Sequence, residues 1–209
     1  PCTKDGDLCT ADVCDGNGAC THPDSSLCEG LISWWNFDEG QGAIAVDSSG
    51  GNDGQLVPDE TDGPQWKTNQ DDPNCVTGGC LMFDGGDDGV VCGEDLALSM
   101  SADCTISLWV SPNSWYRSER LLTNGVFEIT HRGEWAGDRL YFLLRIEDEP
   151  SLGDSSWAYK TGVHSARAFS LGRWHHLVAV KRGQSLEIWI DGINTRPVPH
   201  PTSSTGPPD

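Results

Sequence analysis

The stretch that decides the fold is Trp174–Gly192, with the sequence WHHLVAVKRGQSLEIWIDG. Residues Trp174–Val180 and Leu186–Ile190 each alternate apolar with polar residues and are rich in β-branched and aromatic side chains, which is typical of half-buried strands. A short turn around Gly183 joins them, and Asp191-Gly192 is a tight-turn signal for a further antiparallel strand. This hairpin is therefore expected to lie inside an antiparallel sheet.

Three earlier stretches strengthen this interpretation because they occur in a fixed order before the hairpin. They are LISWWNFDEGQGAIAVDSSGGNDG at residues 31–54, GCLMFDGGDDGVV at residues 79–91 and CTISLWVSP at residues 104–112. Together with WHHLVAV and LEIWIDG, they resemble the motifs of laminin-G-like, concanavalin-A-like jelly-roll domains over residues 31–194. The resemblance implies an all-β, two-sheet antiparallel sandwich that usually binds calcium and serves adhesion or carbohydrate recognition. It does not imply catalysis.

Three segments are expected along the chain. Residues 1–30 are cysteine-rich and nearly devoid of large apolar side chains, so disulfides or a metal must hold them. Residues 31–194 form the expected sandwich, and residues 195–209 form a tail rich in Pro, Ser and Thr.

The excess of acidic over basic residues indicates which kinds of binding partner the chain can have. The chain of 209 residues has 13 Lys and Arg against 32 Asp and Glu, a formal net charge of −19. Such an excess of acid argues against a nucleic-acid partner, because phosphates require basic side chains. It fits calcium ligation as well as adaptation to high salt. No apolar run is long enough for a membrane span, and nine cysteines indicate an extracellular or cell-surface location.

The cysteines are candidates for disulfides. Cys75 and Cys80 flank a Gly-rich turn and can close on each other, and a bridge between Cys92 and Cys104 is plausible because they border adjacent strands. With four cysteines in the sandwich, three pairings stay open. The other five lie in the first segment: Cys2, Cys9, Cys14, Cys20 and Cys28. Nine is odd, so at least one thiol is free or pairs with another chain, and Cys28 at the segment boundary is the candidate.

Calcium is the expected cofactor, and the resemblance implies Asp47, Asn52 and Asp53 as ligands in the loop DSSGGNDG. Plain turn chemistry is the alternative there, since Asn, Asp and Gly favour such geometry. Two further acidic groups are candidates with a solvated turn as the alternative: Asp5, Asp7 and Asp12 in the first segment, and Asp84, Asp87 and Asp88 in a hairpin expected over Phe83–Val91.

Glycan recognition is the competing function, and it needs exposed aromatic side chains. Trp35 is a candidate because Trp34 and Trp35 must point to opposite faces of a strand expected over Leu31–Phe37. The others lie in expected loops: Trp115, Tyr116 and Trp135.

No catalytic arrangement is recognisable. Glu187 and Asp191 would share a strand face about 13 Å apart, at about 3.3 Å per residue, which exceeds the separation of about 5–9.5 Å used by glycosidases. His175 and His176 are adjacent and point to opposite faces, so they do not chelate one metal together. The chain is therefore not expected to be an enzyme.

The tail raises a hypothesis of self-association. Family members continue the hairpin with two more strands, whereas residues 192–209 contain no similar ending. Pro197, Pro199 and Pro201 alternate, so the segment can join a sheet only as an edge strand. Strand addition between chains would then complete each sandwich and build a filament. A polyproline linker is the alternative.

Overall fold

The structure is a computed structural model in which regular secondary structure is entirely strand among the described residues. The chain folds into two compact units, residues 1–96 and residues 97–209. The described residues are 13–14, 20–21, 30–59, 61–68, 75–76, 78–92, 102–114, 118–132, 139–145, 159–168, 170–183, 185–194 and 198–199.

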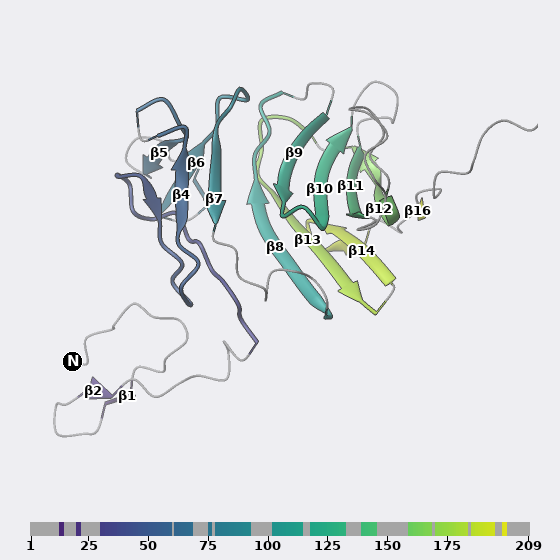
Figure 1. Cartoon of the computed structure of the whole chain (residues 1–209), viewed down its shortest axis with the longest axis horizontal. Coiled ribbons are helices and arrows are strands. Elements are labelled where there is room, and N and C mark those ends of the chain that lie inside the picture. Colours follow the sequence, from purple (N-terminus) through teal and green to yellow (C-terminus); the bar gives the residue numbers. More distant parts are fainter. Residues whose placement is uncertain are drawn as a thin grey trace, which may run out of the picture. The chain divides into compact units, whose positions relative to one another are not determined.

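The second unit contains two antiparallel sheets (Figure 1). The five-stranded sheet has the order β16-β12-β11-β10-β9, with β9 at Ser118–Thr123, β10 at Phe127–Arg132, β11 at Arg139–Arg145, β12 at Tyr159–Ala168 and β16 at Val198–Pro199. The four-stranded sheet has the order β15-β14-β13-β8, with β8 at Cys104–Val110, β13 at His175–Arg182, β14 at Ser185–Ile190 and β15 at Ile193–Asn194.

These two sheets pack face to face on one apolar core. Phe127, Ile129, Leu140, Phe142 and Val163 come from the five-stranded sheet, and Leu177, Ala179, Leu186 and Ile188 from the other. Alternation along the strands puts these residues on the inner faces and their neighbours on the outer faces. The ring of Phe127 meets that of Phe142 edge-on at 6.3 Å, a favourable arrangement for an aromatic pair.

The first unit contains smaller sheets. One has the order β3-β4-β7, with β3 at Ile44–Ala45, β4 at Gly54–Val57 and β7 at Gly89–Cys92. A second pairs β5 at Gln65–Thr68 with β6 at Gly79–Met82, and a third pairs β1 at Val13–Cys14 with β2 at Cys20–Thr21.

The predicted hairpin is confirmed: β13 begins one residue later and ends two residues later than predicted, and β14 begins one residue earlier. β13 and β14 pair from Leu177↔Ile190 to Arg182↔Ser185. The Asp191-Gly192 turn then reverses the chain into β15, with φ values of 53° and 74°. Both are positive, as a two-residue hairpin loop with right-handed strand twist requires.

Several local predictions are wrong. Phe83–Val91 is not a hairpin, because β6 pairs with β5 and β7 pairs with β4. Leu31–Phe37 forms a single bridge, Trp35↔Asp47, in place of a strand, and Phe37 leaves the extended region with a φ of 58°.

Of the C-terminal tail, the structure describes residues 198 and 199. Val198 and Pro199 form β16, which pairs with His164 and Val163 of the same chain at the edge of the five-stranded sheet. The edge position agrees with the prediction, since Pro199 has no N–H to donate to a second neighbour. The expected absence of closing strands is wrong in that β15 and β16 exist, although each has only two residues.

Candidate functional site

Three carboxylates meet in the turn between β6 and β7. Asp84, Asp87 and Asp88 each offer an oxygen, and these oxygens lie within 4.8 Å of one another. Two backbone amides shape the turn: Asp84 N donates to Asp88 Oδ2 at 2.7 Å, and Gly86 N donates to Asp84 Oδ1 at 2.6 Å. Asp88 Oδ1 is shielded from solvent and accepts no hydrogen bond from the described residues. Closely spaced carboxylate oxygens of this kind suit a hard cation such as Ca²⁺.

Asp47 is the centre of the second predicted site, and its carboxylate is occupied by hydrogen bonds. Oδ1 accepts from Trp34 N at 2.8 Å, Ser49 N at 3.0 Å and Ser49 Oγ at 2.8 Å, while Oδ2 accepts from Asn52 N at 3.2 Å. Burial raises the pKa of Asp47, but the hydrogen bonds from Trp34, Ser49 and Ser33 outweigh it and lower the pKa to about 2. The charged side chain of Asp47 thus links this loop to the segment that contains Trp34.

The other two residues predicted for this loop lie beside Asp47. Asp53 Oδ1 accepts from Asp47 N at 2.9 Å, and Asn52 Nδ2 donates to Ser33 Oγ at 2.8 Å. Trp35 is also drawn into the loop, because its indole N–H donates to Asn52 O at 2.8 Å. The structure therefore brings Asp47, Asn52 and Asp53 together. In the described hydrogen bonds, their side chains contact other groups of the same chain.

A serine, a histidine and an aspartate line up at the start of β13. His175 Nδ1 lies 2.8 Å from Asp191 Oδ2, and His175 Nε2 lies 2.9 Å from Ser170 Oγ. Nε2 also lies 3.1 Å from the Ser170 carbonyl oxygen. The roles of Nε2 toward the hydroxyl and the carbonyl oxygen of Ser170 are set by the tautomer of His175. The trio links β13 to the turns that contain Ser170 and Asp191.

Asp191 is the anchor of that trio. Burial raises its pKa, and the hydrogen bonds from His175 and from His176 N, with the charges of His175 and Arg173, lower the pKa below the usual value of 3.8. The carboxylate accepts a hydrogen bond from the His176 backbone N–H to Oδ1 at 3.0 Å and one from Arg173 Nη2 to Oδ2 at 3.4 Å. Asp191 combines a positive φ with several hydrogen bonds to its side chain, and this combination explains why an aspartate occupies the turn.

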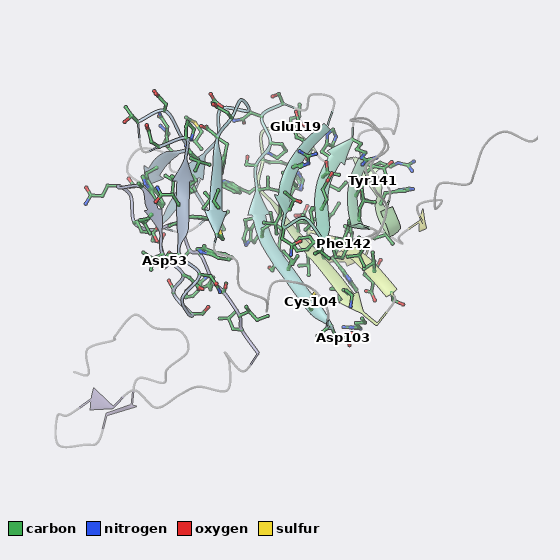
Figure 2. The ribbon with its side chains drawn as sticks, viewed as in Figure 1. Asp53, Asp103, Cys104, Glu119, Tyr141 and Phe142 are labelled. Carbon is green, nitrogen blue, oxygen red and sulfur yellow. A yellow bond between two sulfur atoms is a disulfide. The ribbon has the colours of Figure 1, made fainter. Side chains whose placement is uncertain are left out.

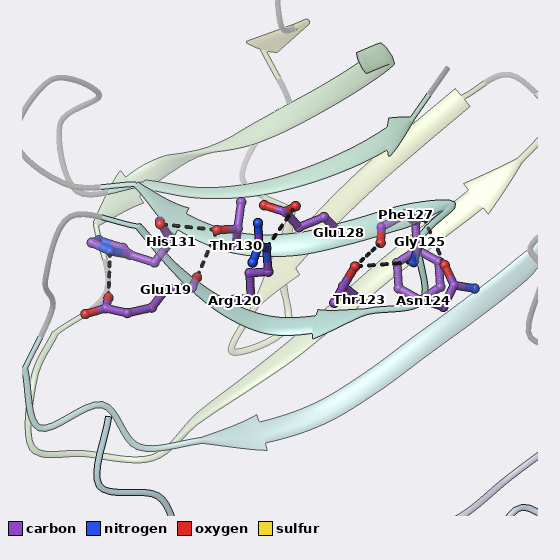
Figure 3. Close-up of polar contacts among 9 residues, drawn as sticks. All are labelled: Glu119, Arg120, Thr123, Asn124, Gly125, Phe127, Glu128, Thr130 and His131. Carbon is purple, nitrogen blue, oxygen red and sulfur yellow. Dashed lines mark hydrogen bonds and ion pairs between the residues drawn. The ribbon is translucent and has the colours of Figure 1, made fainter. Parts of the chain in front are cut away.

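Charged and aromatic side chains lie on the face of β9 to β12 that is turned away from the core between the two sheets, and Glu128, Tyr141 and His164 among them are buried. The sequence had not indicated this group. Arg120 Nε lies 3.4 Å from Glu128 Oε2 (Figure 3). The Arg132 guanidinium lies 5.4 Å from the centre of the Tyr141 ring, and Arg139 lies 3.3 Å from His164 Nδ1. They come from strands whose register is not readable from the sequence.

On the inner side of the same hairpin lies His131, which is fully buried and 3.4 Å from Glu119 Oε2 (Figure 3). The Glu119 carbonyl accepts from Thr130 Oγ1 at 2.9 Å. These contacts hold β9 against β10 beside a register shift between Ile129 and Thr130.

An exposed aromatic pair marks the outer face of the four-stranded sheet. Trp109 is 51% exposed, and its ring stacks on that of His176 with centroids 4.9 Å apart. Ser107 Oγ lies 2.8 Å from His176 Nε2 and fixes the imidazole. A signal was available, because Ile106, Leu108 and Val110 alternate inward and so place Trp109 outward.

A comparison with models of protein families shows the superfamily of this chain. The family model of the concanavalin A-like lectin/glucanase superfamily, Laminin_G_3, matches residues 84–208, which is more than half of the chain. The chain belongs to this superfamily. Neither the curated proteins nor the solved structures gave a significant match.

The superfamily match agrees with the resemblance read from the motifs and with the antiparallel sandwich. It begins at Asp84, so it includes the acidic turn and all strands of the second unit. The stretch at residues 31–54 lies outside the matched residues. Within the described part of the chain, no helix is long and apolar enough to cross a membrane.

Several predicted residues lie outside the described residues or have no described side chain. They are Asp5, Asp7, Asp12, Trp115, Tyr116, Trp135, Cys2, Cys9, Cys14, Cys20 and Cys28. Of these, Cys14 and Cys20 are placed as backbone partners in the β1–β2 pair.

The four cysteines whose side chains are described form one disulfide and two free thiols. Cys75 and Cys80 form the expected disulfide. The expected bridge between Cys92 and Cys104 is not formed, and both are free thiols. Cys92 ends β7 in the first unit, whereas Cys104 (labelled in Figure 2) begins β8 and packs on the core of the second. Burial, aided by the charge of Asp47, raises the pKa of Cys92 to about 11, so this thiol is unreactive at neutral pH.

Proposed function

We propose that this chain is a non-catalytic, extracellular binding module whose acidic turn holds Ca²⁺. The observation that carries the proposal is the group of oxygens from Asp84, Asp87 and Asp88 within 4.8 Å. Ca²⁺ takes six to eight oxygen ligands, including carboxylates and backbone carbonyls, and a turn supplies both. The buried Asp88 Oδ1 adds an acceptor that a cation would satisfy.

The extracellular location is supported by the chemistry of the cysteines. A disulfide closes between Cys75 and Cys80, and structural disulfides persist mainly in oxidising compartments. The non-catalytic character is supported by the hydrogen-bond partners of Glu187 and Asp191, the two carboxylates that the sequence analysis compared with a glycosidase pair. Glu187 accepts from the Trp189 indole at 3.0 Å, and Asp191 is held by His175.

Calcium binding is tested by calorimetric titration of the intact chain with CaCl₂ and separately with MgCl₂. We expect Ca²⁺ to bind, and the double variant Asp87→Asn/Asp88→Asn to lose at least tenfold in affinity. The matched control is Asp62→Asn, which removes a charge from an exposed turn outside the group. Equal losses in all variants would show that Ca²⁺ binds only through the general negative charge, and the site would be refuted.

Carbohydrate binding is a second candidate function, favoured by the exposed Trp109 stacked on His176. Aromatic faces attract the apolar faces of sugar rings, and a superfamily of lectins and glucanases is consistent with a sugar ligand. Screening of neutral and acidic glycans would test it. A Trp109→Ala variant that binds every glycan as well as the wild type would remove this face from the proposal.

Self-association through the tail has no support from the structure, because β16 already pairs with β12 of the same chain. Assembly into a filament is therefore not carried into the proposal.

A further inference from the structure

The outer face of the four-stranded sheet carries two tryptophans on either side of one apolar position. The sheet is formed by β15, β14, β13 and β8 (Figure 1). Because Ala179 and Ile188 point into the core, the residues next to them along β13 and β14 point outward. Val178 therefore lies on the outer face, where it pairs with Ser107 of β8 and with Trp189 of β14.

The second tryptophan is Trp109, which follows Ser107 by two residues and so shares its face of β8. Trp109 pairs with His176 of β13. Two strand spacings of about 4.8 Å and two residues at about 3.3 Å each put the Cα atoms of Trp109 and Trp189 about 12 Å apart across the face. The two tryptophans therefore mark opposite corners of a patch that is wider than one sugar ring.

Solvent reaches this patch. Trp109 is 51% exposed, Ser107 is exposed, and Val178 and Trp189 are half-buried. The covered position is Val180, which lies at the end of β13 away from Trp109 and is 8% exposed. Open aromatic and apolar side chains offer contact area to the apolar surface of a ligand.

Each tryptophan has a polar group fixed beside it. At one corner, the imidazole of His176 stacks on Trp109 with centroids 4.9 Å apart. At the other corner, the Trp189 indole N–H donates to Glu187 Oε2 at 3.0 Å, and Asn194 Nδ2 lies 3.5 Å from the same oxygen. The described hydrogen bonds to the Glu187 side chain both end on Oε2, which leaves Oε1 to accept one from a ligand.

The charges on this face balance, although the whole chain carries a net charge of −19. Alternation along β8, β13 and β14 turns two charged residues outward, Glu187 and the exposed Arg182, and their charges cancel. Asp191, in the turn after β14, is already held by Arg173 and His175. An uncharged ligand therefore suits this face better than an ion.

A sugar matches this combination of groups. Its C–H face packs on an indole ring, and the hydroxyl groups around its edge exchange hydrogen bonds with carboxylate and imidazole groups. Because the tryptophans are separated along a sheet, a chain of sugars that runs straight reaches both of them. A glycan chain that coils presents its apolar faces in changing directions and fits a sheet less well.

We propose that the outer face of the four-stranded sheet binds a neutral, extended oligosaccharide, with Trp109 and Trp189 contacting different sugar rings and Glu187 accepting a hydroxyl hydrogen. The inference rests on the carbohydrate-binding candidate function, and it names the ligand class and a second contact residue, Trp189. It requires that a ligand long enough to reach both tryptophans binds more tightly than a shorter one.

The test measures the affinity of the intact chain for oligosaccharides of different length and shape by calorimetry. The extended ligands are the β-1,4-linked glucose series cellobiose, cellotetraose and cellohexaose and the corresponding mannose series, and maltohexaose is the coiled α-1,4-linked counterpart. We expect the hexaose of one extended series to bind at least tenfold more tightly than its own disaccharide and than maltohexaose. A preference for glucose or for mannose identifies the sugar.

The variants separate the contacts. Trp109→Ala and Trp189→Ala should each lose about tenfold in affinity for the hexaose and reduce its advantage over the disaccharide. Trp189→Phe should lose less, because it keeps an aromatic face. Glu187→Gln should lose about threefold or more, because a hydrogen bond to a charged acceptor is stronger than one to an amide.

The matched control is Phe83→Ala, which removes a 49% exposed aromatic side chain from the first unit. It should bind every oligosaccharide as the wild type does. Circular dichroism with thermal melting identifies any variant that fails to fold. If Trp189→Ala does not fold, Trp109→Ala, at the more exposed position, carries the test together with the length series.

The outcomes that overturn the inference differ from those that overturn carbohydrate binding. A disaccharide that binds as tightly as the hexaose, or a preference for maltohexaose, would leave carbohydrate binding standing and remove the two-tryptophan site. An equal loss in Phe83→Ala would also refute the site. Absence of binding by all these oligosaccharides would refute the inference, whereas the carbohydrate-binding function falls only if the wider glycan screen is negative too.

Discussion

At the scale of single residues, Asp47 shows how a buried charge stabilises a loop. The residue is 4% exposed, and its carboxylate accepts four hydrogen bonds from Trp34, Ser49 and Asn52. The folded pKa of about 2 lies below the ordinary value of 3.8. A depressed pKa contributes stability that is present above pH 3.8 and lost as the pH falls toward 2. The difference corresponds to roughly 2 kcal/mol.

Asp47→Asn should therefore reduce the free energy of unfolding by about 2 kcal/mol at pH 7, because Asn keeps the shape and loses the charge. Urea unfolding at pH 7 and near pH 2.5 measures this. The difference from the wild type should shrink at the lower pH, because near pH 2.5 the Asp47 carboxylate of the unfolded chain is protonated and folding must then release that proton. Asp62→Asn, in an exposed turn, is the control and should change little. A deficit of the same size at both pH values would contradict the role of the charge.

At the scale of elements, β16 is the closing strand of the five-stranded sheet but is only two residues long. It shields Val163 and His164 of β12. Removal of residues 195–209 should uncover the β12 edge and speed amide exchange of β12, with a loss of about 1 kcal/mol from so few hydrogen bonds. Hydrogen exchange of β12 measures the effect, and β10, in the sheet interior, serves as the internal reference.

The same truncation also tests the role of the edge, because an uncovered strand invites pairing with another chain. We expect light scattering to show more association after truncation than before. Unchanged exchange in β12 and an unchanged particle size would show that β16 does not cover this edge in solution.

The elements also show which parts of the fold local sequence predicts. The β13–β14 hairpin was predicted to within two residues, because alternation and the Asp191-Gly192 turn act over a few neighbours. The hairpin expected over Phe83–Val91 was wrong because β6 and β7 choose different partners, β5 and β4. Pairing between distant strands depends on packing that local alternation does not encode.

The candidate sites follow the same division. Asp84, Asp87 and Asp88 were predicted as a group because they lie within five residues of one another, and the structure brings their oxygens together. Trp109 and Trp189 come from β8 and β14 and share one face only through the register of β8, β13 and β14. No spacing in the sequence links them, so they became recognisable as one group only in the fold.

At the scale of the whole molecule, the net charge of −19 makes the folded chain repel itself at neutral pH. Added salt shortens the screening length from about 10 Å at 0.1 M to about 3 Å at 1 M. The melting temperature at pH 7 should therefore rise as NaCl increases over this range. Differential scanning calorimetry at fixed protein concentration measures the shift.

The control for this prediction is the pH. Near the sequence pI of about 4.4 the net charge approaches zero, so the same addition of NaCl should change the melting temperature much less than at pH 7. CaCl₂ at matched ionic strength separates screening from binding, because a cation held by the acidic turn stabilises the folded state further. A melting temperature that is flat or falling with NaCl at pH 7 would show that local pairs, such as His175 with Asp191, outweigh the overall repulsion.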